Sequence, residues 1–276
     1  MMSNQPLVSI VIPCYNVSKY IGAAIDSVLA QTYNNWELLI TDDASTDETV
    51  DVVNGYVEQD SRIHLYRLEK NCGAGIARNN SVAYAQGRYI AFLDADDWWY
   101  PNKLELQMQF MLSNGCEFTF TAFEYTDAEL NVIGVSHKPK SISTLAMKFG
   151  SNIGTPGVVY DTQRIGKMYM PPMRNSEDWS LWIQIADRTG AAYSINRPLW
   201  KYRTLKNSLS RDKLRAVNSV IKVYTDVLHW SKFKSVVIFA LAFLPLYMLK
   251  VVYNKIDSYF YLRNYNSHCV DDLQCR

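Results

Sequence analysis

The segment from Phe92 to Trp99 places three carboxylates within four positions, directly behind an apolar run. At the end of a buried strand, Asp94, Asp96 and Asp97 would repel one another and raise each other's pKa. A single acid there is commonly a helix cap or a solvated turn residue, whereas three together need a compensating positive charge. Mg²⁺ and Mn²⁺ prefer oxygen ligands, and Mg²⁺ often shares its ligands between carboxylates and substrate phosphates. The cluster therefore predicts a divalent-cation site for a phosphate-bearing substrate.

Two further acidic pairs could take part in the same chemistry. Asp42 and Asp43 lie in "ITDDASTD", where they are either turn formers or hydrogen-bond acceptors for a nucleobase or sugar. Glu177 and Asp178 open a predicted helix in "SEDWSLW", where acids complement the helix dipole. The alternative is that this second pair supplies a proton acceptor beside Trp179, which could stack on a sugar.

Two segments offer contacts to phosphate. "NCGAGIARN" contains a partial glycine pattern that opens a helix, which is typical of close helix–sheet packing. The functional alternative uses the helix N-terminus and Arg78 near a diphosphate. "WKYRTLKNSLS" (Trp200 to Ser210) is basic and rich in hydroxyls, so it is either a solvated loop or a segment that closes over phosphates.

Alternating strands and helices must position these residues. Apolar runs at 7–13, 36–41, 63–68 and 89–95 predict strands, and helices are expected over 20–31, from Ser45 or Thr46 onward, and over 73–87. This order indicates an α/β fold with a doubly wound, mostly parallel sheet flanked by helices. Ligands bind outside the carboxyl ends of such strands, so the acids that follow them should gather at one rim.

The remainder of the chain is less regular. We expect a helix over 102–115, a strand over 117–125, a turn and strand over 154–161, and a helix capped by Ser176. "AAYSINRPLWKYR" looks like a returning pair of strands. The segment 126–154 gives no clear pattern and is expected to cover the acceptor side.

Composition narrows the class of protein. The 276 residues are 48% hydrophobic and 20% charged, which is typical of a chain that forms a core. A net charge of +1 argues against nucleic acid as a partner. The five cysteines show no zinc-binding spacing, and their odd number, with no exporting signal, favours a cytoplasmic location.

The C-terminal tail has a different character. Residues 235–249 are apolar and contain Pro245, with lysines on both sides. Fifteen residues fall short of the roughly 20 that a spanning helix needs, and tyrosines further along could lie at a membrane interface. The tail is expected to be a helix embedded in or lying on a membrane. The alternative is a helix packed on its own domain or on a partner, and a full transmembrane pass is the less favoured form.

Taken together, the motifs resemble those of the family 2 glycosyltransferases, an inverting family with the GT-A fold. The motifs that carry the resemblance, over about residues 6–210, are "VSIVIPCYN", "ELLITDDASTDET", "NCGAGIARN", "YIAFLDADDWWYP" and "SEDWSLW". "TYNNWELLITDDASTDET" is similar to bacterial transferases that build surface polysaccharides, including the teichuronic-acid type. The resemblance implies a GT-A domain over 1–210, with a donor half at about 6–115 and an acceptor half at about 116–210. A helical tail, associated with the membrane, would follow over 211–276.

The resemblance also implies roles for individual residues. Asp43, helped by Asp42, would recognise the base, which is uracil in a UDP-sugar, and the edge from Pro13 to Tyr15 would flank it. Asp94 and Asp96 match the D-x-D motif, and Asp178 matches the general base. The donor-binding residues would be Pro13, Tyr15, Asp42, Asp43, Gly73, Arg78, Asp94, Ala95, Asp96 and Arg203; the Mn²⁺ or Mg²⁺ ligands Asp96 and Asp97; and the acceptor-side residues Trp98, Glu177 and Trp179.

One position departs from the family pattern. Relatives often have histidine where this chain has Leu205, so Arg203, Lys206 or Ser208 would have to replace it. The implied reaction moves a hexose-type sugar from a nucleotide donor to a saccharide acceptor, which would be linked to a polyprenyl diphosphate at the cytoplasmic face of the inner membrane.

Three rival interpretations predict features that differ from this sequence. A sugar nucleotidyltransferase needs a glycine- and arginine-rich loop after its first strand, where this chain has "PCYNVSKY". A processive polysaccharide synthase should carry Q-x-x-R-W and several membrane spans. An assembly subunit with a decayed site should have lost acids that are all present here.

Overall fold

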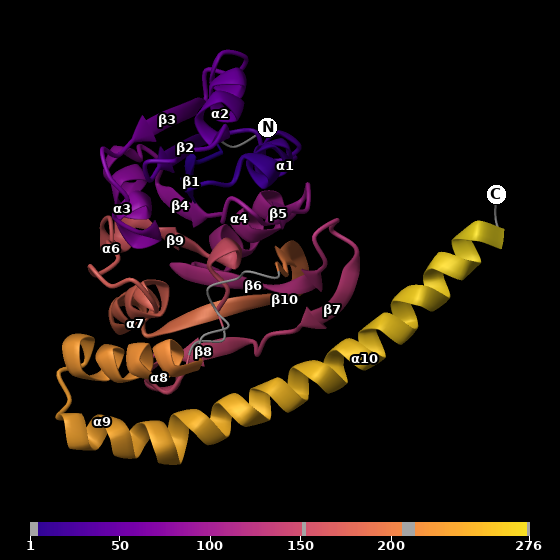
Figure 1. The fold of residues 1–276 in the computed structure, drawn as a ribbon. Coiled ribbons are helices and arrows are strands. Elements are labelled where there is room, and N and C mark those ends of the chain that lie inside the picture. Colours follow the sequence, from indigo (N-terminus) through magenta and orange to yellow (C-terminus); the bar gives the residue numbers. More distant parts are fainter. Residues whose placement is uncertain (1–4, 151–152, 206–212, 275–276) are drawn as a thin grey trace.

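The computed structural model describes residues 5–150, 153–205 and 213–274, with the side chains of 213–216 and 266–274 excepted. Its centre is a mixed sheet in the order β3-β2-β1-β4-β9-β6-β10-β5, with β7 paired to β6 and β8 paired to β10 (Figure 1). The first four strands are parallel: β1 (Val8–Cys14), β2 (Trp36–Asp42), β3 (Ile63–Arg67) and β4 (Tyr89–Phe92). Helices connect them: α1 (Ser18–Leu29), α2 (Thr49–Val57) and α3 (Ala74–Tyr84).

Burial on both faces explains this arrangement. Every residue of β1 and β2 is buried, and successive side chains enter two different cores. Ile10 and Ile12 pack in the core that contains Ile21 of α1, whereas Val11 packs in the core that contains Val82 of α3. The doubly wound arrangement predicted from the apolar runs is therefore confirmed.

The sheet changes direction in its second half. β9 (Val159–Asp161) is antiparallel to both β4 and β6 (Phe118–Thr126), and β10 (Ala191–Arg203) is parallel to β6. The shorter strands are β5 (Trp98–Trp99), β7 (Val132–Ser136) and β8 (Ser141–Ser143). The helical elements here are α4 (Lys103–Asn114), α5 (Thr144–Lys148), η1 (Thr155–Gly157), α6 (Thr162–Ile165) and α7 (Glu177–Thr189).

Three local expectations were wrong. The expected strand pair is the single strand β10, whose pairing with β6 shifts register around Pro198. The helix expected from Ser45 or Thr46 begins at Thr49, because the preceding residues form a loop whose Asp47 side chain accepts from the Ser18 and Thr49 amides. Ser176 precedes α7 but makes no side-chain cap bond; its φ is 61°, and its hydroxyl donates to Ser219.

The tail is helical and longer than its apolar run. α8 (Lys213–Lys222) and the π-helical η3 (Val223–Val227) lead to α9 (Lys232–Ile238), η4 (Phe239–Phe243) and α10 (Leu244–Gln274). α10 extends beyond the domain (Figure 1). The continuous helix Lys232–Tyr265 is long and apolar enough to cross a membrane by length and composition alone, and almost none of its most apolar window is buried.

Proline does not end this helix. Pro245 follows the π-helical turn η4, whose wider backbone accommodates the missing amide donor. Contacts with the domain lie further along α10, where the Ser258 hydroxyl accepts from the Val135 amide (2.9 Å) and Asp257 pairs with His137 (2.9 Å). The tail therefore packs on its own domain, and it also carries an exposed apolar stripe that includes Leu241, Leu244 and Leu249; its contact with a membrane stays a prediction.

Candidate active site

The carboxyl ends of β1, β2 and β4 meet at one rim. Cys14 lies opposite Asp42 in the parallel register, and the Leu93 amide donates to the carbonyl of Val11 (3.0 Å). The two acidic stretches that follow β2 and β4 therefore start on either side of β1, at the same edge of the sheet. This convergence is what strand order alone predicted.

Two arginines supply the positive charge that the acidic cluster requires. Arg78 from α3 lies 2.6 Å from Asp94 and 3.5 Å from Glu177, and its side chain is only 8% exposed. Burial alone would lower the pKa of Arg78, but Asp94 and Glu177 raise it above its usual value. Arg78 therefore stays charged and joins the acidic loop to the start of α7.

Arg203, at the end of β10, also bonds to the acidic loop, which is formed by residues 94–97. Its amide donates to Asp97 Oδ1 (2.9 Å), and its guanidinium donates to the main-chain oxygens of Asp96 (2.7 Å) and Ala128. The guanidinium also lies 4.9 Å from the ring centre of Tyr20. In this structure Arg203 bonds to main-chain oxygens that hold the acidic loop in place, and its expected contact with the donor stays a prediction.

Asp96 and Asp97 remain short of positive partners. Burial and the charge of Asp94 raise the pKa of Asp96 to about 6. Burial, Asp96 and Asp94 raise the pKa of Asp97, which is fully enclosed, and its Oδ2 is buried without a hydrogen-bond partner among the described residues. Such an orphaned carboxylate oxygen suits a hard cation. Within the described part of the chain, no three His, Cys, Asp or Glu residues form a metal site by themselves, so donor oxygens would have to complete it.

Asp43 and Asp42 are buried and hold loops. Asp43 accepts from the amides of Cys72 and Gly73 (both 2.7 Å), and Gly73 has a φ of 96° that favours glycine. Asp42 accepts from the Ser45 amide (3.2 Å) and lies 3.6 Å from Arg67. Each oxygen of Asp43 has a second lone pair, so a base N–H could still be accepted.

Asp178 lies at the first turn of α7 with both oxygens engaged. Oδ1 accepts from the amide of Trp179 (2.7 Å), and Oδ2 accepts from the hydroxyl of Thr155 (3.1 Å). These bonds fix the carboxylate in one orientation. The neighbouring Glu177 has a raised pKa because of burial and Asp178, while Arg78 opposes the rise.

The remaining predicted residues differ in their accessibility. Tyr15 is 45% exposed at the rim, whereas Pro13 and Ala95 are buried and could offer only their main chain. Trp98 is partly exposed, with the Lys201 ammonium 5.4 Å from its ring centre. Trp179 is buried and donates to the carbonyl of Met147 (2.7 Å), so in this structure it packs in the core and cannot stack on a sugar.

Some neighbours of the site gave no signal in the sequence. Thr155, which orients Asp178, stood out only as part of a "GTPG" turn. Gly75 did belong to the glycine pattern of "NCGAGIARN", and it is needed because a Cβ there would lie 3.0 Å from Glu177 Cγ. Leu205 lies just beyond β10. Its suggested replacements Lys206 and Ser208 lie outside the described residues.

Comparisons with known proteins identify the class of protein that has this site. Residues 9–175 match the family model "Glycosyl transferase family 2", and the chain belongs to this family. It is therefore a glycosyltransferase with the GT-A fold. It is 38% identical to TuaG of Bacillus subtilis, a protein assigned to teichuronic acid biosynthesis, over 83% of this chain and 92% of TuaG.

A second relative agrees with this assignment, and two solved structures agree with the fold. WfgD of Escherichia coli, a UDP-Glc:alpha-D-GlcNAc-diphosphoundecaprenol beta-1,3-glucosyltransferase, is 39% identical over 80% of this chain and 86% of WfgD. TarS of S. aureus in complex with UDP-GlcNAc has a TM-score of 0.64 at 19% identity, covering 86% of this chain and 71% of that structure. The mannosyltransferase PcManGT of Pyrobaculum calidifontis in complex with GDP-Man and Mn2+ has a TM-score of 0.64 at 16% identity, covering 83% and 66%.

Proposed function

We propose that this glycosyltransferase moves a hexose-type sugar, with inversion, from a UDP-sugar to a lipid-linked saccharide during synthesis of a bacterial surface polysaccharide. The observation that carries the proposal is the Arg78 bridge, which holds Asp94 of the donor rim beside Glu177 and Asp178. A donor on the acidic rim would then face a carboxylate on the other side of the reacting carbon. The UDP-Glc and diphosphoundecaprenol named for WfgD support the choice of donor and acceptor.

In this mechanism Asp178 is the general base. Thr155 and the Trp179 amide hold its carboxylate in place, and Oδ2 keeps a lone pair that can take the proton of the acceptor hydroxyl. Attack from the face opposite the nucleotide turns an α-linked donor into a β-linked product. No covalent intermediate on the protein is needed.

The donor would lie along the rim. Asp43, with Asp42, would accept from the base N–H, the edge from Pro13 to Tyr15 would flank the base, and Gly73 would let the main chain approach closely. Asp96 and Asp97 would hold Mn²⁺ or Mg²⁺, which would supply charge neutralisation for the departing diphosphate. The Mn2+ named for PcManGT supports this donor set.

The test is a nucleotide-sugar panel that scores nucleotide release with and without Mn²⁺. Asp178→Asn should bind UDP-sugar as the wild type does but lose roughly 10²–10⁴-fold in turnover, the usual contribution of a general base. Asp187→Asn, the same change near the other end of α7, is the control, because Asp187 is 46% exposed and pairs with Lys148. An equal loss of donor affinity and turnover in Asp178→Asn would reassign the residue to binding.

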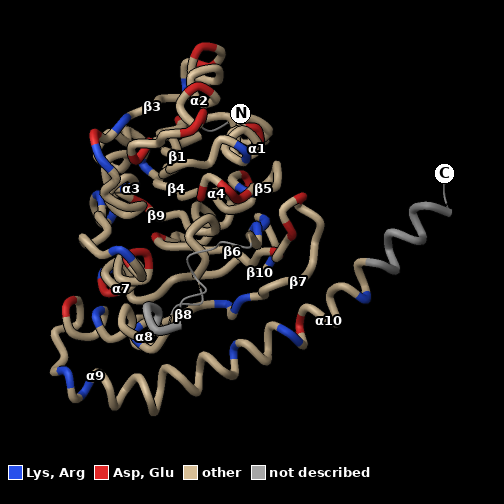
Figure 2. Tube along the Cα trace, viewed as in Figure 1, with Lys and Arg blue, Asp and Glu red and all other residues tan. Residues whose placement is uncertain are grey.

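We also propose that the tail holds the protein on the cytoplasmic face of the inner membrane. Figure 2 shows a long stretch of α9 and α10 without charged residues, bounded by lysines. Leu241 and Leu249 on this stretch are 76% and 66% exposed. Burying a leucine side chain contributes about 1.5–3 kcal/mol, so changing both to glutamate should lower vesicle binding by at least 100-fold.

The matched control is Leu112→Glu on α4, a leucine that is 51% exposed on the catalytic domain. Vesicle sedimentation measures the outcome. Unchanged binding of the double variant would rule out the apolar stripe as the membrane contact.

A further inference from the structure

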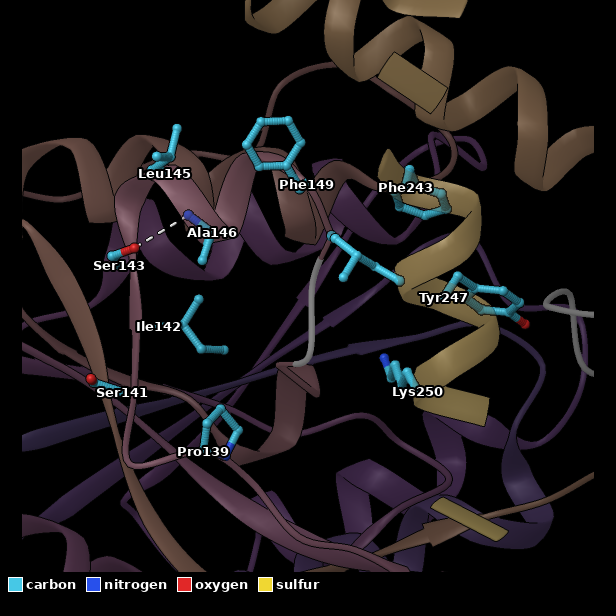
Figure 3. A pocket seen from close by; sticks show the side chains of 12 residues that line it. Pro139, Ser141, Ile142, Ser143, Leu145, Ala146, Phe149, Phe243, Tyr247 and Lys250 are labelled. Atoms are coloured by element: carbon cyan, nitrogen blue, oxygen red, sulfur yellow. Dashed lines mark hydrogen bonds between the residues drawn. The ribbon is translucent and has the colours of Figure 1, made fainter. Parts of the chain in front are cut away.

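An apolar groove lies apart from the acidic rim, between α10 and the segment that carries β8 and α5 (Figure 3). Its volume is about 590 Å³, within the range of about 300–1,000 Å³ that is usual for ligand sites. Its apolar lining includes Ile142, Leu145, Phe149, Phe243 and Tyr247. The groove is thus a ligand-sized space whose two walls belong to the catalytic domain and to the tail.

One end of the groove borders the catalytic helix. The ring of Phe243 lies 5.7 Å from the ring of Trp179, which directly follows Asp178 in α7. A ligand in contact with Phe243 is therefore one aromatic side chain away from the first turn that presents Asp178.

The other end is basic. Lys250 lies seven residues after Phe243, about 10 Å along the helix, and Figure 3 shows its nitrogen directed toward the space between the walls. An adjoining cavity of about 390 Å³ shares Lys250 with the groove and also contains Lys138. The Lys138 ammonium donates to the Ser136 hydroxyl (2.8 Å) and lies 4.5 Å from the ring centre of Phe123.

The basic end also leads back to the site. A Cβ on Gly154 would lie 3.6 Å from the Phe123 ring, and the next residue, Thr155, donates to Asp178. Packed residues therefore connect Lys138 in the adjoining cavity to the residue that orients Asp178, and the groove itself offers an apolar surface with Lys250 at one end.

We infer that this groove binds the lipid of the acceptor, with the first isoprene units along the apolar walls and a phosphate at Lys250; this rests on the proposed function. A polyisoprenyl phosphate joins the same two chemistries, a branched apolar chain and an anion. The apolar stripe of α9 and α10 beside the groove would bring the lipid from the bilayer directly to it. An ordinary phospholipid and a second copy of the chain are the competing occupants.

The test uses undecaprenyl phosphate that carries a diazirine near its phosphate end, added to the full chain in detergent micelles. Photocrosslinks, mapped by mass spectrometry, should fall in residues 142–149 and 243–250. Unlabelled undecaprenyl phosphate should compete, and phosphatidylglycerol should not. Crosslinks confined to the exposed stripe around Leu241, or equal competition by phosphatidylglycerol, would overturn the inference.

A variant that fills the groove with a larger side chain provides a second, independent test. Ala146 is exposed and lines the groove, so Ala146→Trp should reduce crosslinking at least fivefold while the fold is retained. Leu112→Trp, at an exposed position on α4 that is not in the groove lining, is the control and should be labelled to the same extent as the wild type. Labelling of Ala146→Trp at the wild-type level would refute the site.

Nucleotide release separates this inference from the proposed function. UDP release by acceptor-free hydrolysis of the donor should be equal in Ala146→Trp and wild type, whereas transfer to the polyprenyl-linked acceptor should fall at least tenfold in the variant. If neither protein hydrolyses any donor, the proposed function fails, while the crosslinks still show whether the groove binds the polyprenyl phosphate. If hydrolysis and transfer fall together, the groove is not an acceptor site.

Discussion

Replacing Arg78 with methionine tests the charge balance of the site most directly. Methionine keeps much of the length and apolar character of the side chain but removes the only cation 2.6 Å from Asp94 and 3.5 Å from Glu177 in the described structure. Removing one partner of a buried ion pair costs about 3–5 kcal/mol, because the other charge stays buried without compensation. Since the Asp94 side chain is 27% exposed, water would replace part of the interaction with Arg78. We therefore expect Arg78→Met to lower the free energy of unfolding by about 3 kcal/mol, the lower end of this range.

The loss should depend on pH. Burial and Asp178 already raise the pKa of Glu177, and Arg78 is the group that opposes the rise, so without Arg78 the pKa of Glu177 should rise further. A carboxyl group with a raised folded-state pKa binds more protons in the folded state than in the unfolded state. The contribution of such a group to stability is present below its pKa in the unfolded state and is lost as the pH rises through its pKa in the folded state. The destabilisation of Arg78→Met should therefore be greater at pH 8 than at pH 5.

Urea unfolding followed by tryptophan fluorescence at both pH values measures the effect. Arg164→Met is the control, because Arg164 is 67% exposed and 3.9 Å from Glu117, and it should change the free energy of unfolding by less than about 1 kcal/mol. The double variant Arg78→Met with Glu177→Gln should recover part of the loss. A cost below about 1 kcal/mol at both pH values, or a greater cost at pH 5, would refute the reasoning.

Two further predictions concern packing and thiol chemistry. Gly87→Ala should destabilise the fold by about 2–3 kcal/mol, because its Cβ would lie 2.6 Å from a main-chain nitrogen of β1. In Gly55→Ala, in α2, the new Cβ meets nothing within 4 Å, so this variant should be more stable by about 0.5–1 kcal/mol. Equal stability of the two variants in thermal unfolding would contradict this prediction. Cys14 should resist maleimide at pH 8 because it is buried, and burial and Asp42 raise the pKa of its thiol. Cys72 is partly exposed and its amide donates to Asp43, so it should react, and UDP bound at the proposed donor site should slow its reaction. Peptide mass spectrometry gives both rates, and equal labelling of the two cysteines would show that the first strand opens.

The first half of the sheet was predictable because its signals are local and periodic. Apolar runs of strand length lie between helical patterns, and parallel strands necessarily present their carboxyl ends on one edge. These two regularities are sufficient to assign Asp42, Asp43 and Asp94 to a common rim. The expected helix start at Ser45 or Thr46 failed because the side chains of Ser45 and Asp47 accept from the amides of Asn16 and Ser18, which holds this segment as a loop up to Thr49.

The partner of the acidic cluster could not be found in this way. Its positive charge comes from Arg78 and Arg203, which lie 16 and 107 positions away from the residues they contact. Sequence spacing carries no information about such pairs, so the sequence by itself predicts a bound cation as the source of positive charge. Arg78 neutralises Asp94, and Arg203 holds the acidic loop through its hydrogen bonds. Asp96 and Asp97 keep raised pKa values, so the proposed metal site consists of these two acids.

The position of the tail follows from contacts that are also invisible in the sequence. Glu124 in β6 is buried and accepts from the hydroxyls of both Tyr100 and Tyr261, the latter at 2.6 Å. Tyr100 follows β5, which follows the acidic loop, so a single carboxylate links α10 to the segment that carries Asp96 and Asp97. Because this link and the His137–Asp257 pair fix α10 against the sheet, the apolar stripe lies at a set distance from Asp178. A membrane contact through the stripe would therefore fix the height of Asp178, the proposed general base, above the bilayer, as the proposed transfer to a lipid-linked sugar requires.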